Sequence, residues 1–359
     1  MKTKKAIVII FFIILLAPTL TWPLGKLFLN PDITENKKPA EFPAFSDNFI
    51  TEFETYFLDH APYRNLNISL NSKIANKFSN IYYKILDKMN IPYYQIKNNV
   101  LFGEEGWLFY TLDDSLLDYA GTNLPSQEEL DSYLQKAVKV NNYFKSVGKE
   151  FIIFIPPNKE QVYSEYMPDG IRVESETKRV QMITDYISQN SDVKIIYCLD
   201  DLKKEKADKQ LYFKNDTHWN SVGGVYGTNV ILKELGIEVG DITFTEIPSN
   251  FKDLANMALL DVATENDYAV QLSLPNGMIY DKKVTLVADS FGAFMTTPLS
   301  QVFAQISIDG YSTLYENIAF GIEYINSADI FILESVERYD QRIFKNGGLL
   351  DQLISYYGL

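Results

Sequence analysis

The sequence predicts an α/β fold in which a parallel β-sheet is flanked by helices. Two observations lead to this prediction. Short apolar runs of strand type alternate with helix patterns, and their spacing leaves room for crossover helices between parallel strands. A length of 359 residues, 46% of them hydrophobic, is enough for one large domain or two ordinary ones with a well-filled core.

The individual elements follow from hydrophobic spacing and local start signals. Ser126 stands where the N-cap of a helix over 127–147 is expected. The run 100–110 is typical of two short strands around a glycine turn, and 240–281 has weak periodicity and is predicted to be a loop-rich excursion. The remaining predicted helices are 177–187, 221–235 and 349–357, and the predicted strands are 151–155, 193–198, 284–287, 306–308 and 330–333.

The composition limits the classes of partner. The formal net charge is −14, which disfavours a nucleic-acid partner because phosphate binding requires a basic surface. Cys198 is the single cysteine, so the chain can form neither an internal disulfide nor a cysteine-based metal site. Because the chain also has just two histidines, we expect no metal and no cofactor.

Residues 1–25 have the pattern of a membrane anchor or signal-anchor. Three lysines lie within the first five residues, and residues 6–25 then carry no charge. A helix of that size is about 30 Å long, which matches the hydrocarbon core of a bilayer. The lysines predict a cytoplasmic N-terminus with the rest of the chain outside; a cleaved signal peptide is the alternative. Residues 26–47, with three prolines, are the predicted linker to a domain over 48–359.

The candidate catalytic residues lie in two separate stretches. Asp216 comes two residues before His218, and a carboxylate beside an imidazole can fix its tautomer and support it as a base. Ser290 follows the predicted strand 284–287, and sites in open parallel sheets form at the carboxyl ends of strands. The alternative for Ser290 is an ordinary helix cap.

Several short motifs give the chain a family resemblance. The block 216–220, Asp-Thr-His-Trp-Asn, is similar to the acid–histidine block of SGNH-hydrolase-like proteins of the alginate O-acetyltransferase type. The block 288–291, Ala-Asp-Ser-Phe, resembles their nucleophile block, although Ala288 stands where that family usually has glycine. Shorter similarities, among them 156–159, extend the resemblance from about Glu35 to Arg338.

The resemblance implies a fold, a reaction and a set of roles. The fold would be an SGNH-hydrolase-like sheet with a circularly permuted motif order, because the acid and the histidine precede the serine. The reaction would transfer acetyl through a serine ester to hydroxyls of an exopolysaccharide or cell-wall glycan, with a membrane-bound O-acyltransferase partner supplying the acetyl group. Ser290 would be the nucleophile, His218 the base and Asp216 the orienting acid.

Four further residues are candidates for substrate binding: Asn158, Lys159, Trp219 and Tyr212. The alternatives are a turn and a solvated lysine at 158–159, and a core or gate position for Trp219. The alternative functions are a carbohydrate acetylesterase and a non-catalytic glycan-binding subunit of a polysaccharide secretion complex. Because the chain is acidic, we expect a neutral or cationic glycan rather than a uronate polymer.

Overall fold

The computed structural model describes residues 94–275, 277, 279–310 and 318–359, together with Phe42 and Tyr56. The chain divides into two units, and residues 94–255 and 262–359 form the larger one, which carries the sheet described below. The predicted anchor over 1–25 and nearly all of the predicted linker lie outside the described residues. Within the described ranges, no helix combines the length and the apolar character that a membrane span requires.

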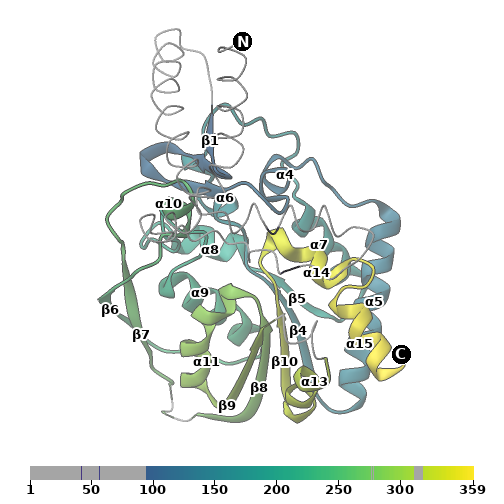
Figure 1. Ribbon diagram of the computed structural model, residues 1–359. Coiled ribbons are helices and arrows are strands. Elements are labelled where there is room, and N and C mark those ends of the chain that lie inside the picture. Colours follow the sequence, from purple (N-terminus) through teal and green to yellow (C-terminus); the bar gives the residue numbers. More distant parts are fainter. Residues whose placement is uncertain (1–41, 43–55, 57–93, 276, 278, 311–317) are drawn as a thin grey trace, which may run out of the picture. The chain divides into compact units, whose positions relative to one another are not determined.

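The core of the larger unit is a five-stranded sheet in the order β5-β4-β10-β8-β9, with every neighbouring pair parallel. The last strand in sequence, β10, lies in the centre between β4 and β8. Figure 1 shows β10 running from α13 towards α14, so the carboxyl ends of the strands lie towards the top of that view. The predicted parallel sheet is therefore confirmed.

The elements of the described chain have the following bounds. The strands are β1 (Gln95–Lys97), β2 (Val100–Phe102), β3 (Leu108–Tyr110), β4 (Glu150–Ile155), β5 (Lys194–Tyr197), β6 (Ile242–Pro248), β7 (Asn266–Leu272), β8 (Tyr280–Ala288), β9 (Phe303–Gly310) and β10 (Ile330–Glu334). The α-helices are α4 (Ser115–Ala120), α5 (Gln127–Ser146), α6 (Lys159–Val162), α7 (Arg179–Asn190), α8 (Leu199–Glu205), α9 (Ser221–Glu234), α10 (Asp253–Met257), α11 (Thr296–Val302), α13 (Ile318–Ser327), α14 (Asp340–Phe344) and α15 (Leu349–Tyr357). The 3₁₀ helices are η1 (Glu104–Gly106), η2 (Ser164–Tyr166), η3 (Ser290–Met295) and η4 (Glu337–Tyr339).

Helices cover both faces of the sheet because its strands are apolar on both sides, as the buried strands β4 and β10 show. Phe151 and Ile153 point into a core shared with α5, α7 and α15, whereas Ile152 and Phe154 point into a core shared with α8, α9 and α11. This alternation follows from the two-residue period of a strand. The helix α5 begins after Ser126, which is its predicted N-cap, and Ser126 forms a capping box with Glu129.

The prediction of a loop-rich excursion over 240–281 was wrong in part: most of the stretch does lie outside the five-stranded sheet, but it is not all loop. This stretch contains β6 and β7, which pair along their full length as an antiparallel ribbon. The side chains of β6 are partly or fully exposed, so the strand lacks the apolar repeat that marks a buried one. β8 likewise begins at Tyr280, earlier than the apolar run 284–287, because its first four side chains are exposed. The strands β2 and β3 confirm the predicted pair around 100–110, and β1 extends them to a three-stranded sheet.

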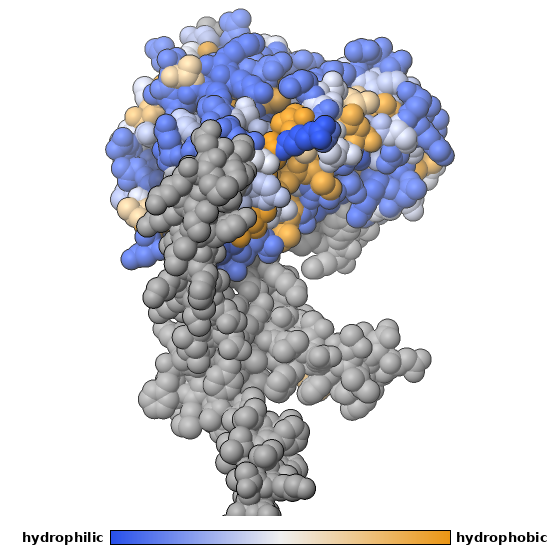
Figure 2. Space-filling model, turned by 90° about the horizontal axis from the view of Figure 1, so that it is seen from above, coloured by the Kyte–Doolittle hydropathy of each residue, from blue (hydrophilic) through white to orange (hydrophobic). Residues whose placement is uncertain are grey.

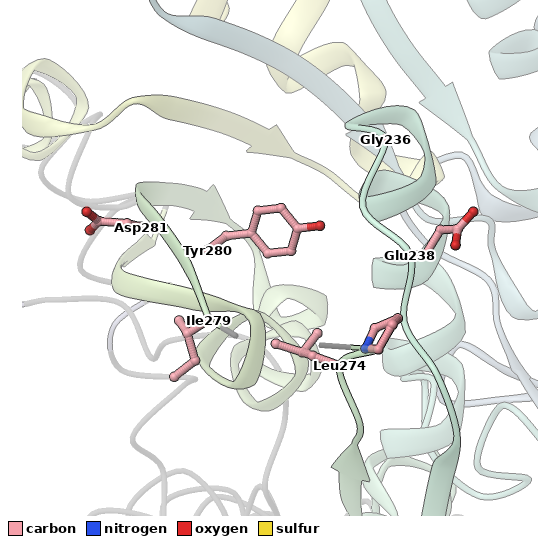
Figure 3. Close-up of a pocket in the computed structure, with 7 residues that line it drawn as sticks. Gly236, Glu238, Leu274, Ile279, Tyr280 and Asp281 are labelled. Atoms are coloured by element: carbon pink, nitrogen blue, oxygen red, sulfur yellow. The ribbon is translucent and has the colours of Figure 1, made fainter. Parts of the chain in front are cut away.

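Figure 2 shows the described domain from the side of the strand carboxyl ends, where apolar side chains gather within a largely hydrophilic face. A pocket of about 470 Å³ lies elsewhere, where the chain leaving α9 passes the connection into β8. Gly236, Leu274 and Tyr280 line it, and the ring of Tyr280 points into it (Figure 3). Tyr280 is the first residue of β8, so the pocket lies at the amino end of that strand.

Candidate active site

The structure brings together the three residues that the sequence placed in separate stretches. His218 Nε2 lies 2.7 Å from Ser290 Oγ, and His218 Nδ1 lies 2.7 Å from Asp216 Oδ1. Asp216 is buried, the His218 side chain is 17% exposed, and Ser290 is exposed. The hydroxyl therefore faces solvent at one end of a relay whose carboxylate lies inside the protein.

The segment that carries the acid and the histidine is a tight loop closed on itself. Tyr212 and Trp219 form a β-bridge, and the Phe213 N–H donates to the carbonyl of His218. Asn220 ends the loop and caps α9, since its side-chain oxygen accepts from two backbone N–H groups of the first turn. The closed loop fixes the positions of the acid and the imidazole relative to each other.

Ser290 lies at the carboxyl end of β8, at the first residue of η3. Asp289 is the N-cap of this 3₁₀ helix, and its carboxylate accepts from the N–H groups of Phe291 and Val336. The alternative of Ser290 as a cap is therefore wrong, and its hydroxyl is directed to the histidine instead. Asp289 also ties the end of β8 to the segment after β10, which holds the serine in place.

Ala288 departs from the glycine that the resemblance led us to expect, and the structure shows how its methyl group is accommodated. A Cβ atom built on Gly292 would lie 2.3 Å from the Cβ of Ala288. The first turn of η3 therefore closes over Ala288 because Gly292 has no side chain.

Asp253 is a site residue that the sequence did not reveal. Its backbone N–H donates to Asp216 Oδ2, and its carboxylate accepts from the N–H and the hydroxyl of Thr217 at 2.7 and 2.6 Å. Its Oδ2 also lies 3.8 Å from His218 Nδ1. Asp253 falls in the stretch predicted to be a loop, where no local pattern links it to a histidine 35 residues earlier.

The two carboxyl groups beside the imidazole have opposite pKa shifts. Burial raises the pKa of Asp216, but hydrogen bonds and the charge of His218 outweigh burial, so the pKa is lowered overall. Burial and the neighbouring Asp216 charge raise the pKa of Asp253. An ionised Asp216 keeps the proton of the imidazole on Nδ1, which leaves Nε2 as the acceptor for the serine hydroxyl.

One group of described side chains is close enough to share a metal ion. It consists of Asp216, His218 and Asp253, whose potential ligand atoms all lie within 4.8 Å of one another. Their polar atoms already bond to one another or to the loop around them. This geometry fits a network that orients the imidazole.

The structure corrects the prediction that four residues bind substrate. Asn158, Lys159, Trp219 and Tyr212 are all at most 2% exposed, so their side chains offer no surface to a substrate. They join the segments around the site instead. The Tyr212 hydroxyl donates to the carbonyl of Pro157 at 2.6 Å, and Trp219 Nε1 donates to the carbonyl of Phe291 at 3.0 Å.

Lys159 makes the most specific of these connections. Its ammonium group donates to the carbonyl oxygens of Phe213, Lys214 and Asp216 at 3.0, 3.1 and 2.6 Å. Burial lowers the pKa of Lys159 to about 8, although neighbouring carboxylates, first among them Asp216, act in the opposite direction. The solvated lysine that was the alternative prediction is therefore wrong, because this side chain holds the loop that presents the acid and the histidine.

Asn158 lies in a group of buried acids beside the site. Its N–H donates to Glu337 Oε2 at 2.8 Å, and its side-chain amide contacts Asp118 at 3.4 Å. Burial raises the pKa of Glu337 to about 8 and that of Asp118 to about 9. Arg338 follows directly, and its guanidinium packs over the rings of Tyr339 and Phe291.

An α/β domain with an aligned serine, histidine and aspartate at the carboxyl edge of a parallel sheet has the arrangement used by serine hydrolases and acyltransferases. Residues 100–242 match the family described as the SGNH hydrolase-like domain of acetyltransferase AlgX, which confirms the predicted resemblance. The matched segment contains Asp216 and His218, and the fold brings Ser290 to them from beyond it.

Several solved structures align with this chain at TM-scores below 0.5. The O-acetyltransferase domain of Pseudomonas putida AlgJ is 18% identical, with 72% of this chain and 99% of that chain covered at a TM-score of 0.49. Bacillus cereus PatB1 with a sulfonyl adduct is 16% identical, with 70% of this chain and 97% of that chain covered at a TM-score of 0.48. Pseudomonas aeruginosa AlgX is 16% identical, with 66% of this chain and 61% of that chain covered at a TM-score of 0.46. No curated protein matches the sequence. At such distances, the reaction and the substrate have to be argued from the residues of this chain.

Proposed function

We propose that this protein is an O-acetyltransferase that moves an acetyl group, through an ester on Ser290, to hydroxyls of a cell-surface polysaccharide. The observation that carries the proposal is the hydrogen-bonded relay from Ser290 Oγ through His218 to Asp216, with both distances at 2.7 Å. The match of residues 100–242 to an acetyltransferase family supports the choice of acyl transfer.

In the first half of the reaction, Ser290 Oγ attacks the carbonyl carbon of an acetyl donor while His218 Nε2 takes the hydroxyl proton. The tetrahedral intermediate then expels the donor's leaving group, which receives that proton. In the second half, a sugar hydroxyl gives its proton to His218 and attacks the acetyl carbon, and Ser290 regains a proton as its ester bond breaks. Asp216 stays ionised and stabilises the imidazolium in both halves.

The negative charge on the acetyl oxygen in each tetrahedral intermediate needs hydrogen-bond donors. Ser290 is the first residue of η3, where backbone N–H groups have no partner inside the helix. The N–H of Phe291 is already bound by Asp289. The backbone N–H of Ser290 is therefore the donor that we assign to the oxyanion site.

The place of the reaction is part of the proposal. The uncharged run 6–25 after three lysines supports an anchor with the catalytic domain outside the cytoplasm. An acetyl donor from the cytoplasm would then have to cross the membrane, and a membrane-bound O-acyltransferase partner would supply it.

The test uses the purified full-length chain with p-nitrophenyl acetate as donor. Ser290→Ala should lower the rate of nitrophenol release by about 10⁴-fold or more, and mass spectrometry should find acetyl on Ser290 in the wild-type protein. Ser300→Ala is the matched control, because Ser300 is also exposed and lies one helix further on, in α11. Equal rates for wild type and Ser290→Ala would refute the proposal.

A carbohydrate acetylesterase uses the same triad with water as the acceptor. The exposed Ser290 is open to water, so this reaction is the competing one. Oligosaccharide added to the acetylated enzyme distinguishes the two functions: an acetylated sugar is the product of a transferase, and free acetate alone is the product of an esterase.

A further inference from the structure

Two phenylalanine side chains lie next to the catalytic imidazole, and the proposed chemistry does not use them. The ring centroids of Phe251 and Phe294 lie 6.3 and 6.2 Å from that of His218, and 5.1 Å from each other. Phe251 is 40% exposed and Phe294 is partly exposed. An exposed phenyl ring beside a reactive serine costs solvation free energy that a bound ligand would recover.

Phe251 is held rigidly although it is exposed. Its ring stacks on the buried Phe213, with centroids 5.1 Å apart and planes 16° apart. Its backbone N–H donates to Ser249 Oγ. Two residues further on, the Asp253 carboxylate binds Thr217, so this loop is fastened to the loop that carries His218.

Phe294 is fixed by a different element. A Cβ atom built on Gly224 of α9 would lie 2.6 Å from both the Cβ and the carbonyl oxygen of Phe294. The backbone of η3 therefore rests directly on α9, and a glycine at 224 permits this approach. Two rings held by separate elements form a preorganised surface that need not be ordered when a ligand binds.

We propose that Phe251 and Phe294 form the acceptor subsite and hold a pyranose ring of the polysaccharide by stacking against its C–H face. This inference rests on the proposed function. The C–H groups of a sugar carry partial positive charge, and the face of a phenyl ring is negative. The planes of the two rings are tilted by 51°, so one ring can stack on the face of the sugar while the other contacts its edge, whereas the acetyl group offers a single methyl. A sugar seated there has its hydroxyls beside His218, the base that must deprotonate one of them.

The test measures partition between transfer and hydrolysis. The full-length chain is given p-nitrophenyl acetate and an excess of pyranose pentasaccharides, cellopentaose and chitopentaose, and acetylated sugar and free acetate are quantified. We expect Phe251→Ala to lower the ratio of transfer to hydrolysis about tenfold, and Phe294→Ala to lower it in the same direction. Phe251→Trp should keep the ratio and Phe251→Leu should lose it, because leucine is apolar but has no ring face.

Tyr280→Ala is the matched control. Tyr280 is also 40% exposed, but it lies at the other end of β8, about 26 Å along the strand from Ala288 at about 3.3 Å per residue. It should leave both products unchanged.

The outcomes separate this inference from the proposed function. A ratio that does not move in Phe251→Ala, or a ratio retained in Phe251→Leu, would overturn the acceptor subsite alone. Free acetate with no acetylated sugar from the wild-type protein would indicate an esterase and overturn the proposed transfer on which the subsite rests. Loss of nitrophenol release in the wild-type protein would instead overturn the proposed acyl chemistry.

Discussion

Replacing Lys159 by methionine tests whether a buried cation sets the geometry of the triad. Methionine keeps most of the side-chain volume and removes the three donors. The carbonyl of Lys214 also accepts from the Leu108 N–H, so it keeps a partner. The carbonyls of Phe213 and Asp216 would lose the donor that Lys159 provides to them.

The magnitude follows from those two carbonyl groups. A buried acceptor that loses its donor costs about 1–3 kcal/mol, so two of them cost about 2–6 kcal/mol. Removing the ammonium group also removes its own burial penalty, which returns part of this cost. We therefore expect Lys159→Met to lower the free energy of unfolding by about 3 kcal/mol.

The effect on catalysis should be larger than the effect on binding. The loop from Phe213 to Asp216 would relax, and a shift of about 1 Å in a catalytic group can cost about 10²-fold in rate. We expect kcat for p-nitrophenyl acetate to fall by about that factor while KM changes little. Denaturant titration gives the stability and steady-state kinetics give the rates, with the exposed Lys203→Met as the control. A Lys159→Met protein with wild-type stability and wild-type kcat would refute the reasoning.

Two further predictions concern η3 and the buried acids. Gly292→Ala should destabilise the fold and lower kcat, because the added methyl group would meet the side chain of Ala288. The double variant Gly292→Ala with Ala288→Gly should recover most of the lost stability and most of the lost kcat. A double variant no better than the single one would contradict this contact. Glu337 has a raised pKa, so the folded state binds more protons than the unfolded state between about pH 4 and 8. The free energy of unfolding should therefore fall as the pH rises through that window. The fall is at most about 1.4 kcal/mol per pH unit for one proton. Denaturant titrations from pH 4 to 9 should show a shallower decline in Glu337→Gln, and an unchanged slope would contradict the assignment.

The sequence predicted the sheet because its central strands are buried on both faces and read as unbroken apolar runs. The strand β10 is an example, with every residue from Ile330 to Glu334 buried. The sequence analysis did not predict β6. The side chains of this exposed ribbon do not pack into a core, so they do not follow an alternation of apolar and polar residues. The order of the strands could not be predicted from the sequence either. The last strand, β10, is central because it pairs with β4 and β8, and local sequence patterns carry no information about such long-range pairing.

The candidate site was predicted where chemistry requires a particular side chain and missed where packing decides the role. Asp216, His218 and Ser290 could be proposed because few other residue types can form a relay of this kind. Trp219 and Lys159 were assigned to the substrate, because an aromatic ring or an ammonium group beside a motif is equally suited to bind a sugar or to support a loop. The exposed fraction of the side chain distinguishes the two roles. At the carboxyl ends of the strands, this fraction depends on which distant segments of the chain cover the residue.

Under the proposed function, the same relay could deliver an acetyl group to water or to a sugar, so these three residues alone do not determine which product forms. In that reaction His218 would remove a proton from either acceptor, and water has access to the exposed Ser290. A transferase must therefore hold its acceptor at the imidazole longer than water resides there. The structure offers Phe251 and Phe294 for this task, because they border the imidazole and are fixed by separate elements. On this argument, the acceptor surface and not the nucleophile separates the transferase from the esterase.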